Sequence, residues 1–392
     1  MKRIFMYLSA ILIVLFASCS KGSVDSLPTP TPGIGGDASE NDPENEFTLA
    51  MFDGSFVPGV DTNTWVITDI NATTEQFEGL RNAINGLSGS DRRIFLEFPN
   101  LDTLASRAFF MCKDVLRSVS FPVATRIGKE AFQSCGALRY VSFPMVTTIE
   151  MNAFFSCRGL RSVSFPAVTT IGETAFQFCD KLNSVSFPLV KTIKKRAFRN
   201  CSNLLSASFP NVITIENGVL SDCVNLHSAS FPMTTMITEK AFSGCYKLET
   251  VSFPIATVIG RGAFASCKSL SDVSFPVVKK IDGYAFSGCV SLTKIALPAV
   301  TELKYNIFSS CYILTSIELA TNKDVKIKSL GAEMFKLPEG LSQEDKITLT
   351  IGSANSENIK GNTLTGSGLS VVHLDVVVPT SYTFKEIIVK IP

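Results

Sequence analysis

Ten cysteines divide the middle of the chain at an almost constant interval. The first interval, from Cys112 to Cys135, is 23 residues long, and each of the eight intervals that follow, up to Cys311, is 22 residues long. Self-similarity at a fixed period of this length is the signature of a solenoid. The period therefore restricts this stretch to a stack of similar turns, each of which packs against its two neighbours.

The repeated unit reads C-x-x-L-x-x-V-S-F-P-x-V-x-x-I-x-x-x-A-F-x-x, and residues 135–156 show it complete. Val and Phe at the seventh and ninth positions lie two residues apart, so a strand places both on one face. Stacked units then form a parallel sheet whose apolar face is directed inward. We expect two aromatic columns in the core. The first comprises Phe121, Phe143, Phe165, Phe187, Phe209, Phe231, Phe253 and Phe275, continued by Leu297 and Leu319, and the second comprises Phe109, Phe132, Phe154, Phe176, Phe198, Phe242, Phe264, Phe286 and Phe308, interrupted by Leu220.

Proline follows the strand in nine consecutive units, from Pro122 to Pro298. Because proline has no amide hydrogen, it cannot donate to the next strand and ends the sheet at a fixed width. Only about twelve residues then return the chain to the next strand, too few for a long crossover helix. We expect short turns or a single helical turn there.

The overall charge is nearly balanced. Lysine plus arginine number 36 and aspartate plus glutamate number 35, which leaves a formal net charge of +1. Such a chain has no global field to attract nucleic acid or an anionic membrane surface. Partner binding would have to depend on local patches.

The first residues predict export. Lys2 and Arg3 precede an apolar run, residues 4–16, which is typical of a secretory signal and shorter than the ~20 residues that a helix needs to cross a bilayer. Phe16-Ala17-Ser18-Cys19 resembles the lipobox of bacterial lipoproteins, and the resemblance implies cleavage before Cys19 and diacylation of its thiol. Because no Asp follows the cysteine, the resemblance favours a location in the outer membrane. The alternative is an ordinary cleaved signal with a coincidental cysteine.

Composition and the extent of the 22-residue repeat divide the chain into five parts. A piece rich in Pro, Gly and acidic residues after Cys19 predicts a disordered tether. Before the repeats, residues 65–68 predict a strand, and Thr73 to Gly86 predicts a helix that would help to cover the first turn. We expect a signal peptide (1–18), a lipidated cysteine with its tether (19–46), an N-terminal cap (47–92), the repeats (93–336) and a β-rich C-terminal cap (337–392) with strands at 347–351, 371–378 and 384–391.

The unit resembles the leucine-rich-repeat family, specifically the BspA-like subgroup of surface lipoproteins of Bacteroidetes type. Those units combine L-x-x-V-x-F/I-P, V-x-x-I and A-F with a cysteine, and the match covers residues 93–336, although the twelfth position carries Val where many such repeats have Asn. The resemblance implies an α/β right-handed solenoid (horseshoe) with a parallel concave sheet, about eleven repeats and little helix. A parallel β-helix is the alternative, which would show more than one alternating stretch in each unit.

The repeated cysteines invite a disulfide or metal hypothesis. Adjacent turns of a parallel stack lie ~4.8 Å apart, which a disulfide tolerates. Side chains in one column point the same way, however, and cysteine is often buried as a small apolar residue. Tetrahedral metal sites need converging ligands rather than a line of them. We therefore expect reduced, buried thiols, with no metal and no cofactor.

The outward positions are the candidate ligand sites. A serine column, which includes Ser142 and Ser164, lies between Val and Phe and should face outward, either as a hydroxyl-lined groove or because stacked strands favour small residues. Arg117, Arg139 and Arg161 occupy one position in three successive units. They could bind carboxylates, sulfates or phosphates in bidentate fashion, or simply be exposed arginines at a rim. Neighbouring Tyr140 adds an aromatic face. Asp272 and Lys294, which lie farther along the repeats, complete the candidate set.

Two groups of charged residues have explanations that need no ligand. Asp272 and Lys294 fall on adjacent strands and could simply pair. A second basic cluster on the return segment indicates a solvated convex face. It comprises Lys191, Lys194, Lys195, Arg196 and Arg199.

Enzymatic motifs are absent from the sequence. There are only two histidines, His227 and His373, and neither a phosphate loop nor a convincing carboxylate pair. The resemblance implies adhesion or binding of a protein or glycan at a cell surface. We expect a monomeric, non-enzymatic outer-membrane lipoprotein, exposed at the surface, that touches the membrane only through its lipid and binds no nucleic acid. A carbohydrate-capturing lipoprotein of a nutrient-uptake system and a structural envelope protein are the alternatives.

Overall fold

The described part of the chain covers the whole repeat region. The computed structural model describes residues 56–58, 64–67, 74–86, 94–320, 329–330, 347–351, 359–360, 363–366, 369–373 and 387–390. Contacts divide the chain into two compact units, Met1–Phe47 and Thr48–Pro392, and every described residue lies in the second. The expected signal, Cys19 and the tether lie outside the described residues and stay predictions.

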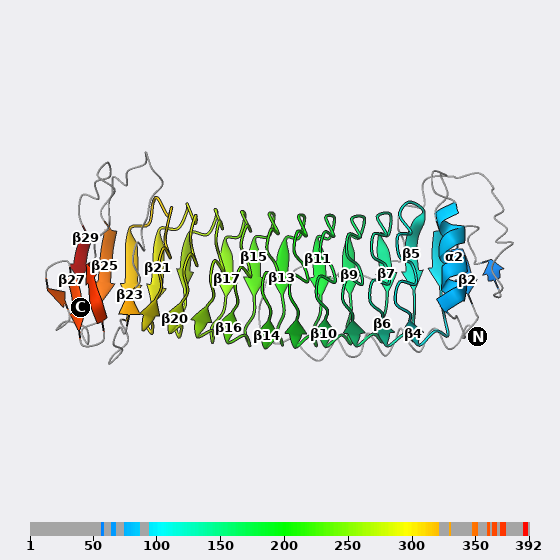
Figure 1. The fold of residues 1–392 in the computed structure, drawn as a ribbon, viewed down its shortest axis with the longest axis horizontal. Coiled ribbons are helices and arrows are strands. Elements are labelled where there is room, and N and C mark those ends of the chain that lie inside the picture. The colour runs from blue at the N-terminus through cyan, green and yellow to red at the C-terminus, as the bar shows by residue number, and fades with distance from the viewer. Residues whose placement is uncertain are drawn as a thin grey trace, which may run out of the picture. The chain divides into compact units, whose positions relative to one another are not determined.

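Each turn of the repeat contributes one short strand to a first parallel ladder (Figure 1). Equivalent residues pair, as Val163 does with Val185, and pairing is interrupted between β7 and β9, between β11 and β13 and between β17 and β19. The strands are β3 (Ile94–Glu97), β5 (Leu116–Ser120), β7 (Tyr140–Ser142), β9 (Ser162–Ser164), β11 (Ser184–Ser186), β13 (Ser206–Ser208), β15 (Ser228–Ser230), β17 (Thr250–Ser252), β19 (Asp272–Ser274), β21 (Lys294–Leu297) and β23 (Ser316–Leu319).

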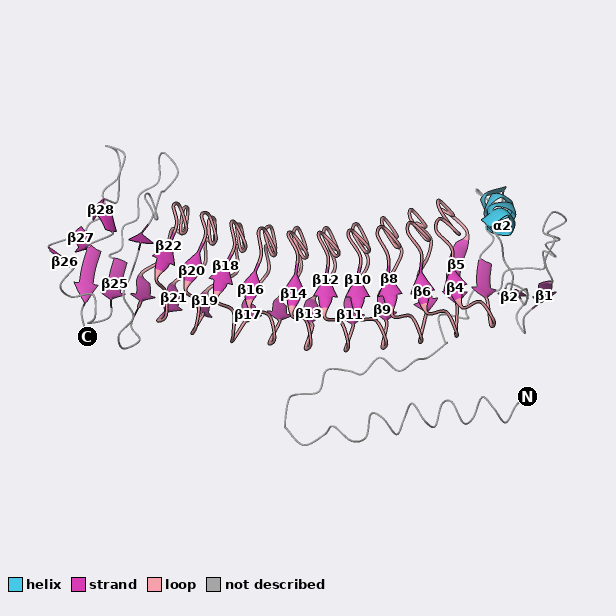
Figure 2. Cartoon of the chain, turned by 60° about the horizontal axis from the view of Figure 1, so that its bottom comes forward, coloured by secondary structure: helices cyan, strands magenta, loops and turns pink. Residues whose placement is uncertain are grey.

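The return segment forms a second parallel ladder of two-residue strands (Figure 2). In each described turn the second residue of the strand, such as Ile171, is buried and the first lies on the surface side. The strands are β4 (Thr103–Leu104), β6 (Arg126–Ile127), β8 (Thr148–Ile149), β10 (Thr170–Ile171), β12 (Thr192–Ile193), β14 (Thr214–Ile215), β16 (Met236–Ile237), β18 (Val258–Ile259), β20 (Lys280–Ile281), β22 (Glu302–Leu303) and β24 (Ser329–Leu330).

The second ladder corrects the expectation of turns alone on the return path. Two residues are too few to show an alternating pattern, yet they pair in register with the next turn. The molecule is thus a parallel-strand β-solenoid of about ten turns of roughly 22 residues, with no α-helix between residues 94 and 320. The predicted parallel solenoid with little helix is confirmed, whereas the horseshoe curvature stays a prediction.

The two phenylalanine columns fill the interior as predicted. Phe143 stacks on Phe121 with ring centroids 5.1 Å apart, and Phe154 stacks on Phe132 at 5.2 Å. Between the columns, Phe132 meets Phe143 edge to face at 6.0 Å. All of these rings are fully buried, so each turn buries aromatic surface against its neighbours.

One helix lies beside the first turns. Strand β1 (Phe56–Pro58) pairs antiparallel with β2 (Thr64–Ile67), and β2 pairs parallel with β3. Helix α2 (Thr74–Gly86) begins one residue after Thr73, the predicted start. Its buried Phe77 lies 6.0 Å from Phe98 and 5.6 Å from Phe109, between ring centroids. Phe98 stacks on Phe121 with ring centroids 4.5 Å apart and so extends the first column by one ring. The helix therefore packs on the end ring of each column.

The strands near the C-terminus extend the first ladder. Strand β25 (Ile347–Ile351) pairs parallel with β23, and β29 (Ile387–Lys390) pairs parallel with β25. A separate antiparallel sheet holds β26 (Ile359–Lys360), β27 (Thr363–Gly366) and β28 (Leu369–His373). The strand predicted at 347–351 is confirmed, β28 begins two residues before its predicted start, and β29 lies inside the predicted range. The domain boundaries stay predictions.

A tight loop around Ala-Phe holds two left-handed residues in each turn. In one turn these are Asn152, with φ of 57°, and Ser156, with φ of 58°. The N–H groups of Asn152, Phe154 and Ser156 donate to carbonyls of the next turn at 2.7–3.0 Å. The loops, which line one edge of the stack in Figure 2, thus form a third set of bonds between turns.

The repeat cysteines lie at the end of this loop and are buried. All ten are free thiols, and burial raises the pKa of Cys311 to about 12. The Cys157 Sγ donates to the Phe132 carbonyl at 3.0 Å, and eight other repeat cysteines make the equivalent bond. The cysteine therefore fills a small apolar site and supplies one more weak donor between turns.

The left-handed positions predict opposite effects for two glycine substitutions. At Gly262, with φ of 58°, an added Cβ has its nearest neighbours 3.7 Å away, so only backbone strain opposes Gly262→Ala. We expect this change to lower the free energy of unfolding in urea by about 1–2 kcal/mol. At Gly79, inside α2 with open space around it, the same change should raise it by about 0.5–1 kcal/mol. Equal effects of the two changes would contradict the left-handed assignment.

Candidate functional site

The first ladder turns a regular set of side chains toward solvent. In β9, buried Val163 lies between exposed Ser162 and Ser164. We call the outward residues at the fifth, sixth and eighth positions of each unit the strand face. Most serines of the eighth position are exposed on it, namely Ser142, Ser164, Ser186, Ser208, Ser252 and Ser274, while Ser120 and Ser230 are half-buried.

The structure brings three arginines together on adjacent turns of the strand face. The Arg139 N–H donates to the Arg117 carbonyl at 2.8 Å, and the Arg161 N–H donates to the Arg139 carbonyl at 3.4 Å. We call these three residues the arginine row. Arg161 is exposed, and Arg117 and Arg139 are half-buried. The row lies close to the point where β7 and β9 cease to pair.

An insertion sets the first arginine apart. Strand β3 pairs Ile94 with Leu116 and Phe95 with Ser118, so Arg117 is the extra residue of a bulge. The bulge accounts for the 23-residue interval between the first two repeat cysteines. Bulges redirect side chains and recur next to binding sites. The insertion therefore modifies the repeat at the first residue of the arginine row.

Two arginines of the row have no acidic partner among the described residues. Within residues 94–320, neither Arg139 nor Arg161 forms an ion pair with an acidic side chain, and Tyr140 beside them is 43% exposed. Farther along the stack the same position changes character. It is occupied by Asn183, Leu205, His227 and Glu249.

A cavity of about 510 Å³ borders the row. Its wall includes two basic residues, Lys113 and Arg158, and one acidic residue, Asp114. The carbonyl of Ala137, which also lines it, accepts a hydrogen bond from Arg117 Nη1 at 3.3 Å. Arg158 is partly neutralised by Asp180 at 3.5 Å. The lining comes from the variable residues around the cysteine in adjacent turns. No motif marks those residues, so sequence analysis missed the cavity.

Asp272 and Lys294 are brought opposite each other but not joined. They pair in register between β19 and β21, and both are exposed. Their side chains form no ion pair among the interactions of the described residues. They lie several turns from the arginine row and are not part of the same surface.

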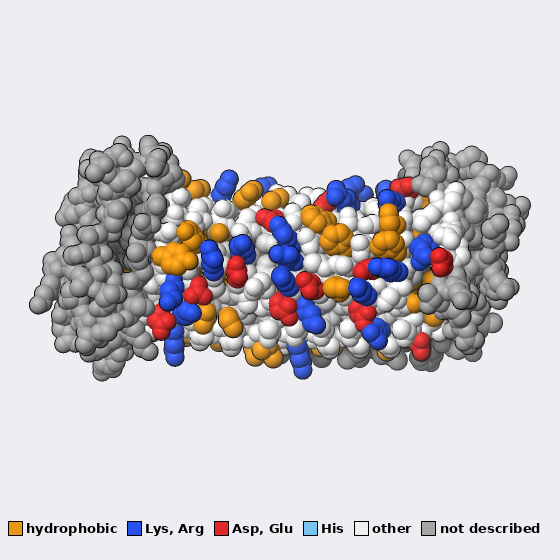
Figure 3. Space-filling model, in the orientation of Figure 1, with side chains coloured by type: hydrophobic (Ala, Val, Ile, Leu, Met, Phe, Trp, Pro, Cys, Tyr) orange, Lys and Arg blue, Asp and Glu red, His pale blue; other side chains and the backbone are white. Residues whose placement is uncertain are grey.

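Charges elsewhere on the repeats are mixed. Figure 3 shows Lys and Arg side chains interspersed with Asp and Glu side chains over one face. In the second basic cluster, Arg199 Nε lies 3.0 Å from Asp222 Oδ2, and the Lys195 backbone N–H donates to Glu216 at 3.0 Å. These acidic neighbours favour the interpretation of a solvated face.

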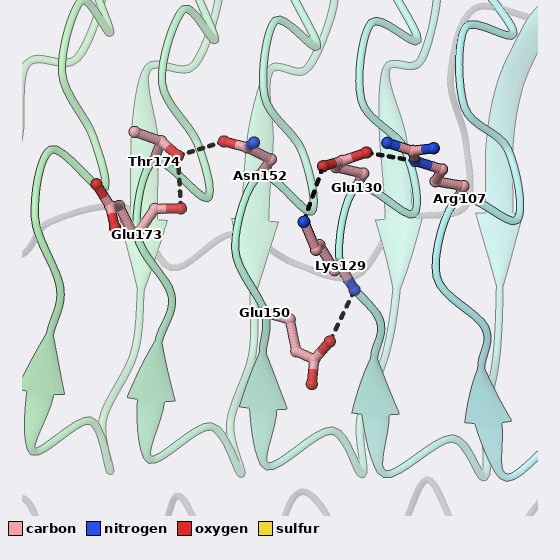
Figure 4. A network of polar contacts seen from close by, with 7 residues as sticks. All are labelled: Arg107, Lys129, Glu130, Glu150, Asn152, Glu173 and Thr174. Atoms are coloured by element: carbon pink, nitrogen blue, oxygen red, sulfur yellow. Dashed lines mark hydrogen bonds and ion pairs between the residues drawn. The ribbon is translucent and has the colours of Figure 1, made fainter.

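A polar network links successive loops on the repeats (Figure 4). Arg107 Nε donates to Glu130 Oε2 at 2.5 Å, and Lys129 Nζ lies 3.5 Å from Glu130. Asn152 and Thr174 bond to each other in the next turns. Glu130, Asn152 and Thr174 all have positive φ, so their side-chain bonds between turns offset part of the backbone strain. The network is structural rather than a binding site.

The described residues offer neither a metal site nor a membrane span. They contain no cluster of three or more His, Cys, Asp or Glu side chains placed to hold a metal ion. No helix among them has the length and apolar character needed to cross a bilayer.

Stacked parallel strands, buried consensus residues and a variable outward face define a leucine-rich-repeat type of β-solenoid. The sequence pattern of the BspA type leucine rich repeat region matches in six copies, over residues 93–188, 125–249 and 235–369. The chain belongs to this family.

Solved structures with a similar fold come from several bacteria. The pneumococcal vaccine antigen PcpA is 20% identical, with 86% of this chain and 99% of that chain covered and a TM-score of 0.42. A leucine-rich repeat protein from Bacteroides ovatus is 18% identical (75% and 99% covered, TM-score 0.30). A leucine rich cell surface protein from Faecalibacterium prausnitzii is 21% identical (72% and 96%, TM-score 0.31). No curated protein matches the chain.

The Arg107–Glu130 pair predicts a pH-dependent stability. The hydrogen bond from Arg107 holds the pKa of the Glu130 carboxyl below its ordinary value. Its contribution is therefore complete above the unfolded pKa of about 4.3 and is lost as pH falls through the lower folded pKa. We expect Glu130→Gln to reduce unfolding free energy by about 1 kcal/mol at pH 7 and to have no effect near pH 2.5.

The control is Glu173→Gln, since Glu173 forms no side-chain ion pair within the described repeats. Urea unfolding at the two pH values measures both variants. A pH-independent loss in Glu130→Gln would show that packing, not charge, explains its effect.

Proposed function

We propose that this chain is a lipid-anchored bacterial surface protein that binds an extracellular protein or glycan through the strand face. The observation that carries the proposal is the arginine row, three arginines in register on adjacent turns. The row lies beside a cavity lined by Lys113, Arg158 and Asp114. The family and its solenoid architecture support a scaffold that presents a binding surface rather than a catalytic centre.

The chemistry of the row indicates an acidic partner. Arginine side chains on turns ~4.8 Å apart repel one another, and an anionic ligand would relieve this repulsion. The planar guanidinium group matches carboxylate and sulfate groups with two parallel hydrogen bonds. Acidic proteins and glycans that carry carboxylates or sulfates are therefore the partners that fit.

Replacement of the row tests the proposal. We expect the triple change of Arg117, Arg139 and Arg161 to Ser to weaken partner binding at least about tenfold, since each lost charged hydrogen bond is worth about 1.5–3 kcal/mol. Surface plasmon resonance against immobilised extracellular matrix proteins and sulfated or uronate glycans measures the loss, which should shrink at high salt.

A matched control separates local recognition from net charge. Lys191, Lys194 and Arg196 changed together to Ser remove the same charge from exposed positions of the second basic cluster. Equal weakening by both triple variants would reduce the effect to net charge. Unchanged binding by the triple variant of Arg117, Arg139 and Arg161 would rule out the arginine row as the binding site. Binding of neutral glycans alone would favour nutrient capture, and no binding of any kind would favour a structural envelope protein.

The anchor is a separate part of the proposal and has its own test. We expect Cys19→Ser to abolish incorporation of radiolabelled fatty acid and to move the protein from the outer-membrane fraction to a soluble fraction. Cys112→Ser serves as the control, because that thiol is buried in the repeats. Surface exposure is checked by protease treatment of intact cells. Fatty-acid labelling that persists in Cys19→Ser would disprove the lipobox interpretation.

A further inference from the structure

The second ladder is broken at one place, between β14 and β16. In neighbouring turns the residue before each of these strands donates its N–H to the equivalent carbonyl of the preceding turn, as Ile213 does to Lys191 at 3.0 Å. The residue after the strand makes a second such bond, as Glu216 does to Ile193 at 2.9 Å. Neither bond forms from Thr235 or Thr238 within the described repeats.

Two threonine hydroxyls bridge the break, but they bond to other carbonyls than the missing backbone bonds would. Thr234 stands where other units have Val or Ala, and its Oγ1 donates to the Val212 carbonyl at 2.8 Å. Thr238 Oγ1 donates to the Glu216 carbonyl at 2.9 Å. The carbonyls of Ile213 and Ile215 are consequently left without the partners that this ladder normally supplies.

The break is confined to one side of the turn. The first ladder pairs normally here, with Ser206 opposite Ser228, and the loop bond from Gly218 N–H to the Glu239 carbonyl is intact at 2.9 Å. An inserted peptide strand would have to lie ~4.8 Å from the strand on each side of it. Because the two turns are held together at these two places, they cannot move that far apart. The break leaves room for a small ligand only.

A cavity of about 400 Å³ lies at the break. This volume falls in the range of small-molecule sites. Ile213 and Met236, which are 52% and 51% exposed, supply apolar surface, and Asn217 adds an amide. Lys195 and Glu216 also line the cavity and carry opposite charges, so the cavity has no strong net sign.

We propose that this cavity, which we call the ladder gap, binds a neutral hydroxylated ligand, namely one or two sugar residues of a saccharide. A sugar carries both hydrogen-bond donors and acceptors, which suits unpaired backbone N–H and carbonyl groups together. Its C–H surface packs on Ile213 and Met236. Its hydroxyls take the place of water that otherwise satisfies the backbone groups.

The ladder gap is independent of the proposed function. It belongs to the second ladder, whereas the arginine row belongs to the strand face, and the two suit ligands of different charge. Loss of the arginine row leaves saccharide binding at the gap unchanged, and blocking the gap leaves binding of an acidic partner unchanged.

The test uses the purified full-length chain in detergent and a fixed panel of maltotriose, cellotriose, xylotriose, mannotriose and N,N′-diacetylchitobiose. Saturation-transfer NMR detects binding, and calorimetry measures affinity. We expect at least one of these saccharides to bind with one site per chain, and Met236→Asp to weaken it at least tenfold, which is about 1.4 kcal/mol.

Matched variants keep the result interpretable. Val258→Asp changes the equivalent residue one turn later, where the ladder is intact, and should alter affinity less than twofold. Met236→Ala, a mild change at a half-exposed position, should also weaken binding if Met236→Asp fails to fold. Absence of binding by every saccharide of the panel overturns the proposal. The proposal is also overturned if a saccharide binds and neither Met236→Asp nor Met236→Ala changes its affinity.

Discussion

Hydrogen bonds between corresponding segments of successive turns are the constraint on which the rest of this solenoid depends. Within one turn, Arg139 and Thr147 donate to the preceding turn, whereas Asn152, Phe154 and Ser156 donate to the following one. Buried backbone groups must be paired, so every part of the turn has to lie beside its counterpart. This requirement explains the strict 22-residue length, and it explains why the single insertion among the early units appears as a bulge at Arg117. The aromatic columns follow from the same alignment, because rings attached to stacked backbones must themselves stack.

The sequence predicts the parts of the unit that repeat in residue type. The phenylalanine columns, the inward valines and the buried cysteines could all be located from spacing alone. The structure confirms the burial of the phenylalanines and cysteines, whereas Val141, Val185 and Val251 are only partly buried. The second ladder could not, because two-residue strands such as β10 carry no alternation. The left-handed positions were also hidden. In the described turns only Gly218 and Gly262 are glycines at the first of them, and the other turns have Arg, Glu, Asn, Thr, Lys or Tyr there. No regular glycine pattern therefore marks a conformation that the surrounding hydrogen bonds impose.

The turns that contain Ala207 and Ala229 show how a local departure from the consensus affects the stack. Leu220 interrupts the second aromatic column, and Ala207 and Ala229 replace the usual valine of the first ladder. Thr234, in the same region, replaces a buried aliphatic residue by one with a hydroxyl. These substitutions are visible in the sequence, but their consequence is not. Only the positions of the backbone groups show that the second ladder breaks while the first remains paired.

The arginine row is informative because the fold does not require it. Like charges opposite each other on adjacent strands destabilise a sheet, at a cost of up to about 1 kcal/mol per pair in water at this spacing. Farther along the stack, Asn183 and Thr293 occupy the same position, and the ladder forms equally well there. Arg117 donates a hydrogen bond to the Ala137 carbonyl, but the fold offers no comparable reason for Arg139 and Arg161. The proposed function accounts for these residues through a contact with a partner outside the molecule. This reasoning separates the arginine row from the serine column, which small-residue packing already explains.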